Sequence, residues 1–188
     1  MTQSNASCSP PESSRHNHLT RVLSYTWGDR NNTAPIVVNG CRFNVTVNLE
    51  RALRYLRRPD AKRPLLIDAI CINQQDDRER EIQVRVMAAI FKHSTKVLIW
   101  LGKELDPSIR DGGPSPTSIS EVFEVISNVA AEKSITHLVG ETPRERWDRW
   151  IPSPLDLLKR PWFRRLWAVQ GTAMTPDPML ICGKWSLP

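Results

Sequence analysis

No apolar run in this sequence approaches the ~20 residues that a helix needs to cross a bilayer. The first 18 residues contain no apolar core, which argues against a secretory signal peptide. We therefore expect a cytoplasmic protein. The same stretch is rich in Ser, Pro, Asn and His, so we predict a disordered tail over 1–18 and one folded domain over 19–188.

The sequence has little of the chemistry that marks metal, disulfide or cofactor proteins. Its four cysteines stand apart at positions 8, 41, 71 and 182, without a CxxC pair or metal-like spacing. Cys71 and Cys182 lie in apolar stretches, where a thiol is typically a small buried side chain. This pattern favours a reducing compartment without disulfides. The chain also lacks a P-loop, a GxGxxG fingerprint and an HExxH motif, so we predict no metal and no bound cofactor.

Positive charge is in excess, with a formal net charge of +6. Such a charge permits binding to nucleic acid or to an anionic surface, but the chain has no basic–aromatic interleaving and no helix-turn-helix pattern, so we do not expect nucleic acid as the partner. The densest basic cluster follows a predicted helix. A solvated helix face is the favoured interpretation of it, and a functional patch is the alternative. The cluster consists of Arg51, Arg54, Arg57, Arg58, Lys62 and Arg63.

Short apolar runs alternate with helical patterns along the chain. We predict strands at 21–26, 64–72, 96–101 and 179–182, helices at 47–58, 76–93 and 120–131, and a hairpin at 36–45 that turns at Asn39-Gly40. The run 64–72 is uniformly apolar, which is typical of a strand buried on both faces. The order predicts an α/β fold with a mainly parallel sheet, helices on both faces, an added β-hairpin and extra helices.

The helix at 76–93 has the clearest predicted start. Asp76 and Glu79 have the spacing of a capping box, and carboxylates in a first turn complement the helix dipole. The periodicity places Gln83 and Arg85 outward. On the core face it places Ile82, Val86, Ala89 and Ile90.

Polar residues follow the predicted buried strands. Asp68 lies within the run 64–72, where a charge is costly unless it is hydrogen-bonded. It is either a site carboxylate at the carboxyl edge of the sheet or an anchor for the loop 73–76. Asn73 and Gln74 either bind a ligand or tie down their own loop.

Two more strands end in tryptophan and glycine: Trp27-Gly28-Asp29 and Trp100-Leu-Gly102. Here glycine permits either a tight turn or close approach of a ligand, and the tryptophans more often complete a core than grip a ligand. We expect the loops after the strands to converge on one crevice containing Trp27, Asp68, Asn73 and Gly102.

Three sequence blocks resemble, in order, the heterokaryon incompatibility (HET) domain of filamentous fungi. They are LSYTWGD at 23–29, DAICINQ at 68–74 with WLG at 100–102, and PWFRRLW at 161–167. The resemblance implies a signalling module of fungal non-self recognition and programmed cell death. It also implies partners among other HET-domain or incompatibility proteins, self-association, and a chain that is truncated relative to longer family members. In the last block, Arg164 and Arg165 either pair with Asp68 or Asp76 or hold phosphates.

The HET domain in turn resembles the TIR domain, a flavodoxin-like fold. In many TIR domains a glutamate in a Trp-Cys-x-x-Glu motif cleaves NAD. The corresponding stretch here runs from Trp167 through Gln170 to Gly171, so glycine stands where that glutamate is expected. Because glycine offers no acid or base, the resemblance implies weak or absent NAD hydrolysis. Asp68 and Asp76 are then the remaining candidate carboxylates, and a TIR-like hydrolase and a basic nucleic-acid-binding module are the alternative functions.

Overall fold

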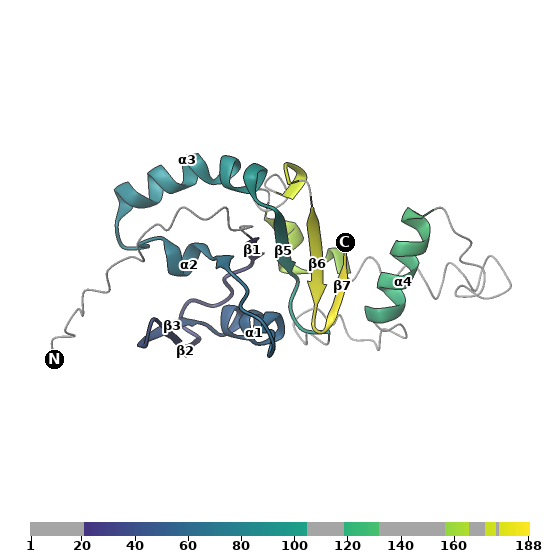
Figure 1. Cartoon of the computed structure of the whole chain (residues 1–188), viewed down its shortest axis with the longest axis horizontal. Coiled ribbons are helices and arrows are strands. Elements are labelled where there is room, and N and C mark those ends of the chain that lie inside the picture. Colours follow the sequence, from purple (N-terminus) through teal and green to yellow (C-terminus); the bar gives the residue numbers. More distant parts are fainter. Residues whose placement is uncertain (1–20, 105–118, 132–156, 166–171, 176) are drawn as a thin grey trace, which may run out of the picture.

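The computed structural model describes residues 21–104, 119–131, 157–165, 172–175 and 177–188 (Figure 1). Its centre is a five-stranded sheet in the order β4-β1-β5-β6-β7. Neighbouring strands are parallel from β4 to β6, and β7 is antiparallel to β6. The mainly parallel sheet is therefore confirmed. The strands are β1 (Arg21–Tyr25), β4 (Leu65–Leu66), β5 (Lys96–Trp100), β6 (Pro178–Cys182) and β7 (Trp185–Leu187).

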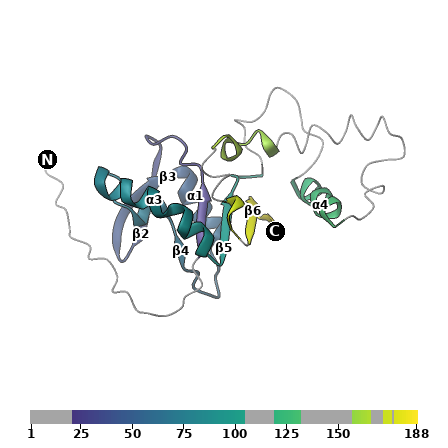
Figure 2. The same ribbon diagram turned by 90° about the horizontal axis from the view of Figure 1, so that it is seen from above.

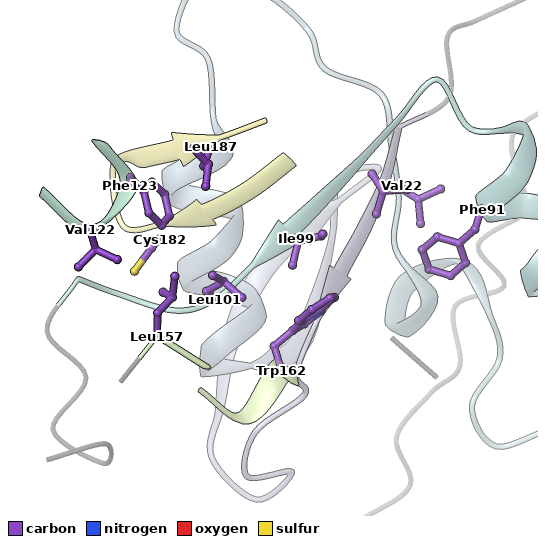
Figure 3. Close-up of a cluster of buried hydrophobic side chains, with 11 residues drawn as sticks. Val22, Phe91, Ile99, Leu101, Val122, Phe123, Leu157, Trp162, Cys182 and Leu187 are labelled. Atoms are coloured by element: carbon purple, nitrogen blue, oxygen red, sulfur yellow. The ribbon is translucent and has the colours of Figure 1, made fainter. Parts of the chain in front are cut away.

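Alternation along β1 and β5 divides the core between the two faces of the sheet. Val22, Val97 and Ile99 belong to one buried cluster, which also contains Phe91 and Trp162 (Figure 3). The intervening residues of the same strands, among them Leu23, Tyr25, Leu98 and Trp100, belong to the other. Successive side chains of a strand point to opposite faces, so both faces of this sheet are covered.

Helices lie against both faces, as the sequence predicts. One cluster is closed by α1 (Val47–Leu56) and α2 (Asp68–Cys71). The other is closed by α3 (Asp77–His93), α4 (Ile119–Ala130) and the 3-10 helix η2 (Pro161–Arg164). Two ribbon views place α4 beside the β7 end of the sheet, far from α1 (Figure 1 and Figure 2).

A separate hairpin joins β1 to α1, as predicted. It consists of β2 (Thr33–Val38) and β3 (Cys41–Thr46). Asn39 and Gly40 both have positive φ angles, 51° and 78°, which is the geometry of a type I′ turn. Thr46 then caps α1, because its hydroxyl accepts a hydrogen bond from the Leu49 amide at 3.4 Å.

The predicted strand at 64–72 is wrong over most of its length. Only Leu65–Leu66 is β-strand, and Asp68–Cys71 is a helical turn. The Asp68 carboxylate accepts a hydrogen bond from the Ala69 amide at 2.7 Å, and a carboxylate there stabilises the free amides of a helix start. Periodicity does not separate a short buried strand from a short buried helix. Cys71 is consequently exposed, against the prediction, whereas Cys182 is buried as predicted.

The start of α3 is confirmed, but three of the four residues of its predicted core face are exposed. Ile82 and Val86 are 52% and 41% exposed, and Ala89 is also exposed. Ile90 packs against the core as predicted, but Met87 and Phe91 join it in place of the other three, and Gln83 is half-buried rather than outward. Each residue turns a helix by about 100°, so a seam displaced by one position brings a different set of side chains inward. Arg85 is exposed as predicted.

The remaining expectations have mixed outcomes. Pro161 begins a helix, as predicted, although it is a 3-10 turn, and β7 was not predicted. The predicted tail over 1–18 lies outside the described residues. None of the helices within the described ranges combines the length and apolarity that crossing a bilayer requires.

Candidate functional site

Asp68 lies where β1 and β4 end, and its carboxylate joins the segments that follow both strands. Its Oδ2 accepts a hydrogen bond from the indole Nε1 of Trp27 at 3.1 Å, and its Oδ1 accepts one from the Ala69 amide. The prediction that Asp68 is at least partly buried and hydrogen-bonded is confirmed. The expected donors from the loop 70–76 or from an arginine are wrong, because the side-chain donor comes from the end of β1.

Tyr25 completes what we call the Asp68 cluster, which consists of Tyr25, Trp27 and Asp68. Burial raises the pKa of the Tyr25 phenol above its ordinary value of 10.0, and the negative charge of Asp68 and a hydrogen bond to it raise it further. The positive charge of Arg165 opposes this shift of the Tyr25 pKa. The phenol is therefore held neutral beside the carboxylate.

The loop after α2 is tied to its own backbone. Gln74 Nε2 donates to the backbone carbonyl of Asp68 at 3.0 Å, and Asn73 Oδ1 accepts from the Gln75 amide at 3.1 Å. The side chain of Asp76 caps α3 by accepting from the amides of Arg78 and Glu79, at 2.9 and 3.1 Å. These contacts favour the anchoring interpretation of the three side chains and give Asp76 a structural role.

A second network links the ends of β1 and β5 through Asn48. Its Nδ2 donates to the Thr26 carbonyl at 2.6 Å, and its Oδ1 accepts from the indole of Trp100 at 3.1 Å. Trp100 is fully buried, which fits the expectation that it completes the core. Gly28 has a φ of +75°, and a Cβ there would stand 3.6 Å from the Asn48 Cβ, so this glycine is needed for its backbone conformation.

The other sequence-predicted positions lie apart from the Asp68 carboxylate. Asp29 is exposed and accepts a hydrogen bond from the Asn31 amide at 2.9 Å, as in a local turn. Gly102 follows β5, and its carbonyl accepts from the Gly183 amide at 2.8 Å. Trp27 and Asp68 thus meet as predicted, but no hydrogen bond joins Asn73 or Gly102 to them in the part of the chain that the structure describes.

The two arginines of the last sequence block do not pair with the candidate carboxylates. Arg165 Nη1 donates to the backbone carbonyl of Tyr25, and Arg164 is exposed. Within the described ranges, neither arginine forms an ion pair with Asp68 or Asp76. Arg165 nonetheless fixes the block to the end of β1. It thus has the structural role that the sequence offered, but its partner is the Tyr25 carbonyl instead of a carboxylate.

Sequence reasoning missed Arg160, the buried basic residue next to this block. Its Nη1 donates to the carbonyls of Leu101 and Lys103 at 2.8 and 2.7 Å, and its Nη2 donates to that of Glu104 at 3.1 Å. The side chain is 4% exposed. Trp162, two residues later, donates its indole hydrogen to Ser24 Oγ at 2.9 Å. The segment 160–165 therefore fastens the chain after β5 and the end of β1 to each other.

The sequence profile of the heterokaryon incompatibility protein (HET) family matches residues 21–171. The chain belongs to this family. It is also 30% identical over 204 aligned residues to heterokaryon incompatibility protein 6, OR allele, of Neurospora crassa. That alignment covers 86% of this chain but only 28% of the relative, so the chain spans about a quarter of that protein. No solved structure matches this chain.

The three HET blocks now have positions in the structure. The first is the end of β1 with its loop, the second is α2 with its loop, and the third begins as η2. Hydrogen bonds from Trp27 to Asp68 and from Arg165 to Tyr25 connect all three. Trp167, Gln170 and Gly171 of the third block lie outside the described residues. Among the described side chains, no three His, Cys, Asp or Glu residues gather as metal ligands would.

The buried phenol makes the stability of the HET domain sensitive to alkali. Above pH 10 the unfolded chain releases the Tyr25 proton while the folded protein retains it, because the folded pKa is raised. The unfolded state then binds fewer protons, so stability should fall as pH rises, by up to ~1.4 kcal/mol per pH unit. Urea denaturation between pH 8 and pH 11 should show this slope, and Tyr25→Phe should reduce it.

Tyr55→Phe supplies a matched test, since the chain has only two tyrosines. In that variant Tyr25 is the sole phenol, and phenolate absorbance should not develop until the protein unfolds. Phenolate absorbance that develops near pH 10 in the folded Tyr55→Phe protein would contradict the burial argument.

Proposed function

We propose that this chain acts in fungal non-self recognition, as a HET-domain signalling module whose engagement leads to programmed cell death. The observation that carries the proposal is the match of the family profile over residues 21–171. The similarity to the Neurospora relative supports it as well, because that relative is named as an incompatibility protein. The expected partners are other HET-domain or incompatibility proteins.

Association with another protein is the mode of action that the described surface supports best. Large aliphatic side chains remain exposed on α3, where Ile82 is 52%, Val84 54% and Val86 41% exposed. Ile82 and Val86 are one helical turn apart and form a stripe that the core does not use. Exposed apolar patches on otherwise ordinary surfaces typically mark contact sites. We therefore propose that the Ile82–Val86 stripe contributes to assembly.

The finer fold proposal is a flavodoxin-like sheet. Numbered by their place in the chain, the parallel strands lie in the order second, first, third, fourth, which is the order of the first four strands of flavodoxin-type sheets. Ligands of such sheets bind at the carboxyl edge. The Asp68 cluster occupies this edge, and that position favours the TIR-like alternative, NAD cleavage, as the second candidate function.

The bonding of the candidate carboxylates supports the binding role over catalysis. Asp68 accepts from Trp27 and Ala69, and Asp76 accepts from two amides of α3. Both carboxylates thus hold the fold together. We propose that NAD is at most a slow substrate, because Gly171 removes the carboxylate that the TIR resemblance singles out.

Expression of the chain in one of two incompatible fungal strains tests the proposal. The chain should change the extent of cell death where the strains fuse, without depleting cellular NAD. The double variant Ile82→Asp, Val86→Asp should lose most of this effect, because two carboxylates disrupt an apolar contact. Arg85→Asp changes the charge by the same amount on an exposed side of the same helix and should keep the effect.

Two results would contradict the proposal. Unchanged cell death with the unaltered chain would remove the role in incompatibility. Loss of NAD in cells that express the unaltered chain would favour the hydrolase and would direct attention to Asp68 and Asp76. NAD loss only in the Gly171→Glu variant would instead support the missing-glutamate account.

A further inference from the structure

Arginines gather at the amino edge of the sheet, opposite the edge that carries the Asp68 cluster. Arg21 is the first residue of β1, and it stands in register with Leu65 of the parallel strand β4. Arg63 precedes Leu65 by two residues. Because parallel strands begin at the same edge, Arg21 and Arg63 enter neighbouring strands side by side.

Helix α1 brings a third arginine to this edge. The helix begins beside the carboxyl end of β1, where Asn48 bonds to the Thr26 carbonyl. Its 10 residues span about 15 Å, and the 5 residues of β1 span about 17 Å, so the helix ends near the level at which the strand starts. Arg58 follows this end. Its charge and that of Arg21 both lower the pKa of Arg63, which agrees with this placement of the two arginines near Arg63.

The fold leaves this charge nearly uncompensated. Within the described residues, no carboxylate forms an ion pair with Arg21 or Arg63. Arg58 pairs with Asp60 at 3.4 Å, with both side chains more than half exposed, which is a weak pair. At the same edge, Lys96 has its own partner, Asp177, at 2.9 Å. Among the residues that the structure describes, Arg21 and Arg63 thus lack the counterion that the neighbouring lysine has.

The basic cluster that we interpreted from the sequence as a solvated helix face consists of two parts in the structure. Arg51 and Arg54 do lie on the exposed face of α1, and Arg54 pairs with Glu50. Arg63 is partly buried, and burial is the largest cause of its lowered pKa. Holding three like charges together with one of them desolvated is costly unless an anion joins them.

We propose that Arg21, Arg58 and Arg63 form a binding site for the phosphate group of a phosphomonoester or diphosphate. Guanidinium forks match phosphate oxygens in bidentate geometry, and a doubly charged phosphate balances three arginines better than a single carboxylate does. The phosphate belongs either to a soluble phosphorylated compound or to a phosphorylated lipid headgroup. The site is independent of the proposed function, because it lies at the other edge of the sheet and is assayed on the purified chain.

Calorimetric titration of the full chain with inorganic pyrophosphate at low ionic strength tests the site. Binding should be measurable, and Arg63→Gln and Arg21→Gln should each weaken it ~10-fold or more, since each removes a charge-assisted contact. Arg51→Gln removes the same charge from an exposed position on α1 and should change the affinity less than ~2-fold. An absence of binding, or equal losses in all three variants, would overturn the proposal.

Vesicle sedimentation identifies the source of the phosphate. Binding to phosphatidylcholine vesicles that contain a phosphatidylinositol monophosphate, lost in Arg63→Gln, would assign the lipid headgroup. Pyrophosphate binding without vesicle binding would assign a soluble compound. Tighter binding to a single-stranded oligonucleotide, whose phosphodiesters carry one charge each, than to pyrophosphate would contradict the phosphomonoester site and favour general electrostatic attraction.

Discussion

Replacement of Arg160 with methionine should lower the free energy of unfolding by about 3 kcal/mol. The substitution keeps most of the apolar volume but removes all three hydrogen bonds to the carbonyls of Leu101, Lys103 and Glu104. A buried acceptor left without its donor costs about 1–3 kcal/mol, and the Leu101 carbonyl lies in the core. Equilibrium urea denaturation, followed by tryptophan fluorescence, measures the difference.

Two variants separate this effect from loss of charge alone. Arg160→Lys retains the positive charge but cannot bond three carbonyls in the geometry of a fork. Its free energy of unfolding should therefore lie between those of the unaltered protein and Arg160→Met. Arg164→Met removes an exposed arginine from the same segment and should cost less than ~0.5 kcal/mol. If Arg160→Met and Arg164→Met cost the same, the bonds of Arg160 do not support the fold as described.

Arg160 also illustrates what the sequence of this protein conceals. Its three acceptors are 56 to 59 residues earlier in the chain, and no periodic pattern distinguishes it from the exposed Arg164. By contrast, β1, β5 and the hairpin were predictable because each depends on local signals: an apolar run that stops at Gly or polar residues, and an Asn-Gly turn. Local sequence rules predict helices, strands and turns, whereas contacts between distant segments can be identified only once the fold is known.

The stretch around Asp68 shows the same difference between local features, which could be predicted, and distant contacts, which could not. The acid itself was predictable, since a carboxylate among apolar residues requires hydrogen bonds. Its helical turn was not predictable. Trp27, 41 residues away, was expected in the same crevice, but its direct hydrogen bond to the carboxylate was not predicted. The local bonds of Asn73 within its own loop and of Asp76 at the start of α3 were predictable, because both side chains bond to amides within three residues of themselves. The prediction of the core face of α3 was mostly wrong, because the helix has enough apolar positions to form more than one apolar face.

Replacement of Asp68 with alanine should lower the free energy of unfolding by about 2–3 kcal/mol. The carboxylate accepts from the Trp27 indole and the Ala69 amide and lies beside the Tyr25 phenol, so its loss leaves half-buried donors without an acceptor. Asp68→Asn keeps the shape and one acceptor oxygen and should cost about 1 kcal/mol. Asp29→Ala removes an exposed carboxylate with one local bond and should cost less than Asp68→Ala.

A double-mutant cycle with Trp27→Phe assigns the loss to the pair rather than to either residue. Trp27 and Asp68 share a direct bond at 3.1 Å, so the cycle should give a coupling of about 1 kcal/mol, against nearly none for Trp27 with Asp29. A coupling near zero for Trp27 with Asp68 would refute the anchoring role. If the coupling is as expected and the folded Asp68→Asn protein still alters incompatibility, then Asp68 serves the HET domain by holding its first two sequence blocks together. If that protein is stable but inactive, the same carboxylate acts on a ligand at the carboxyl edge, and the structural role alone does not account for it.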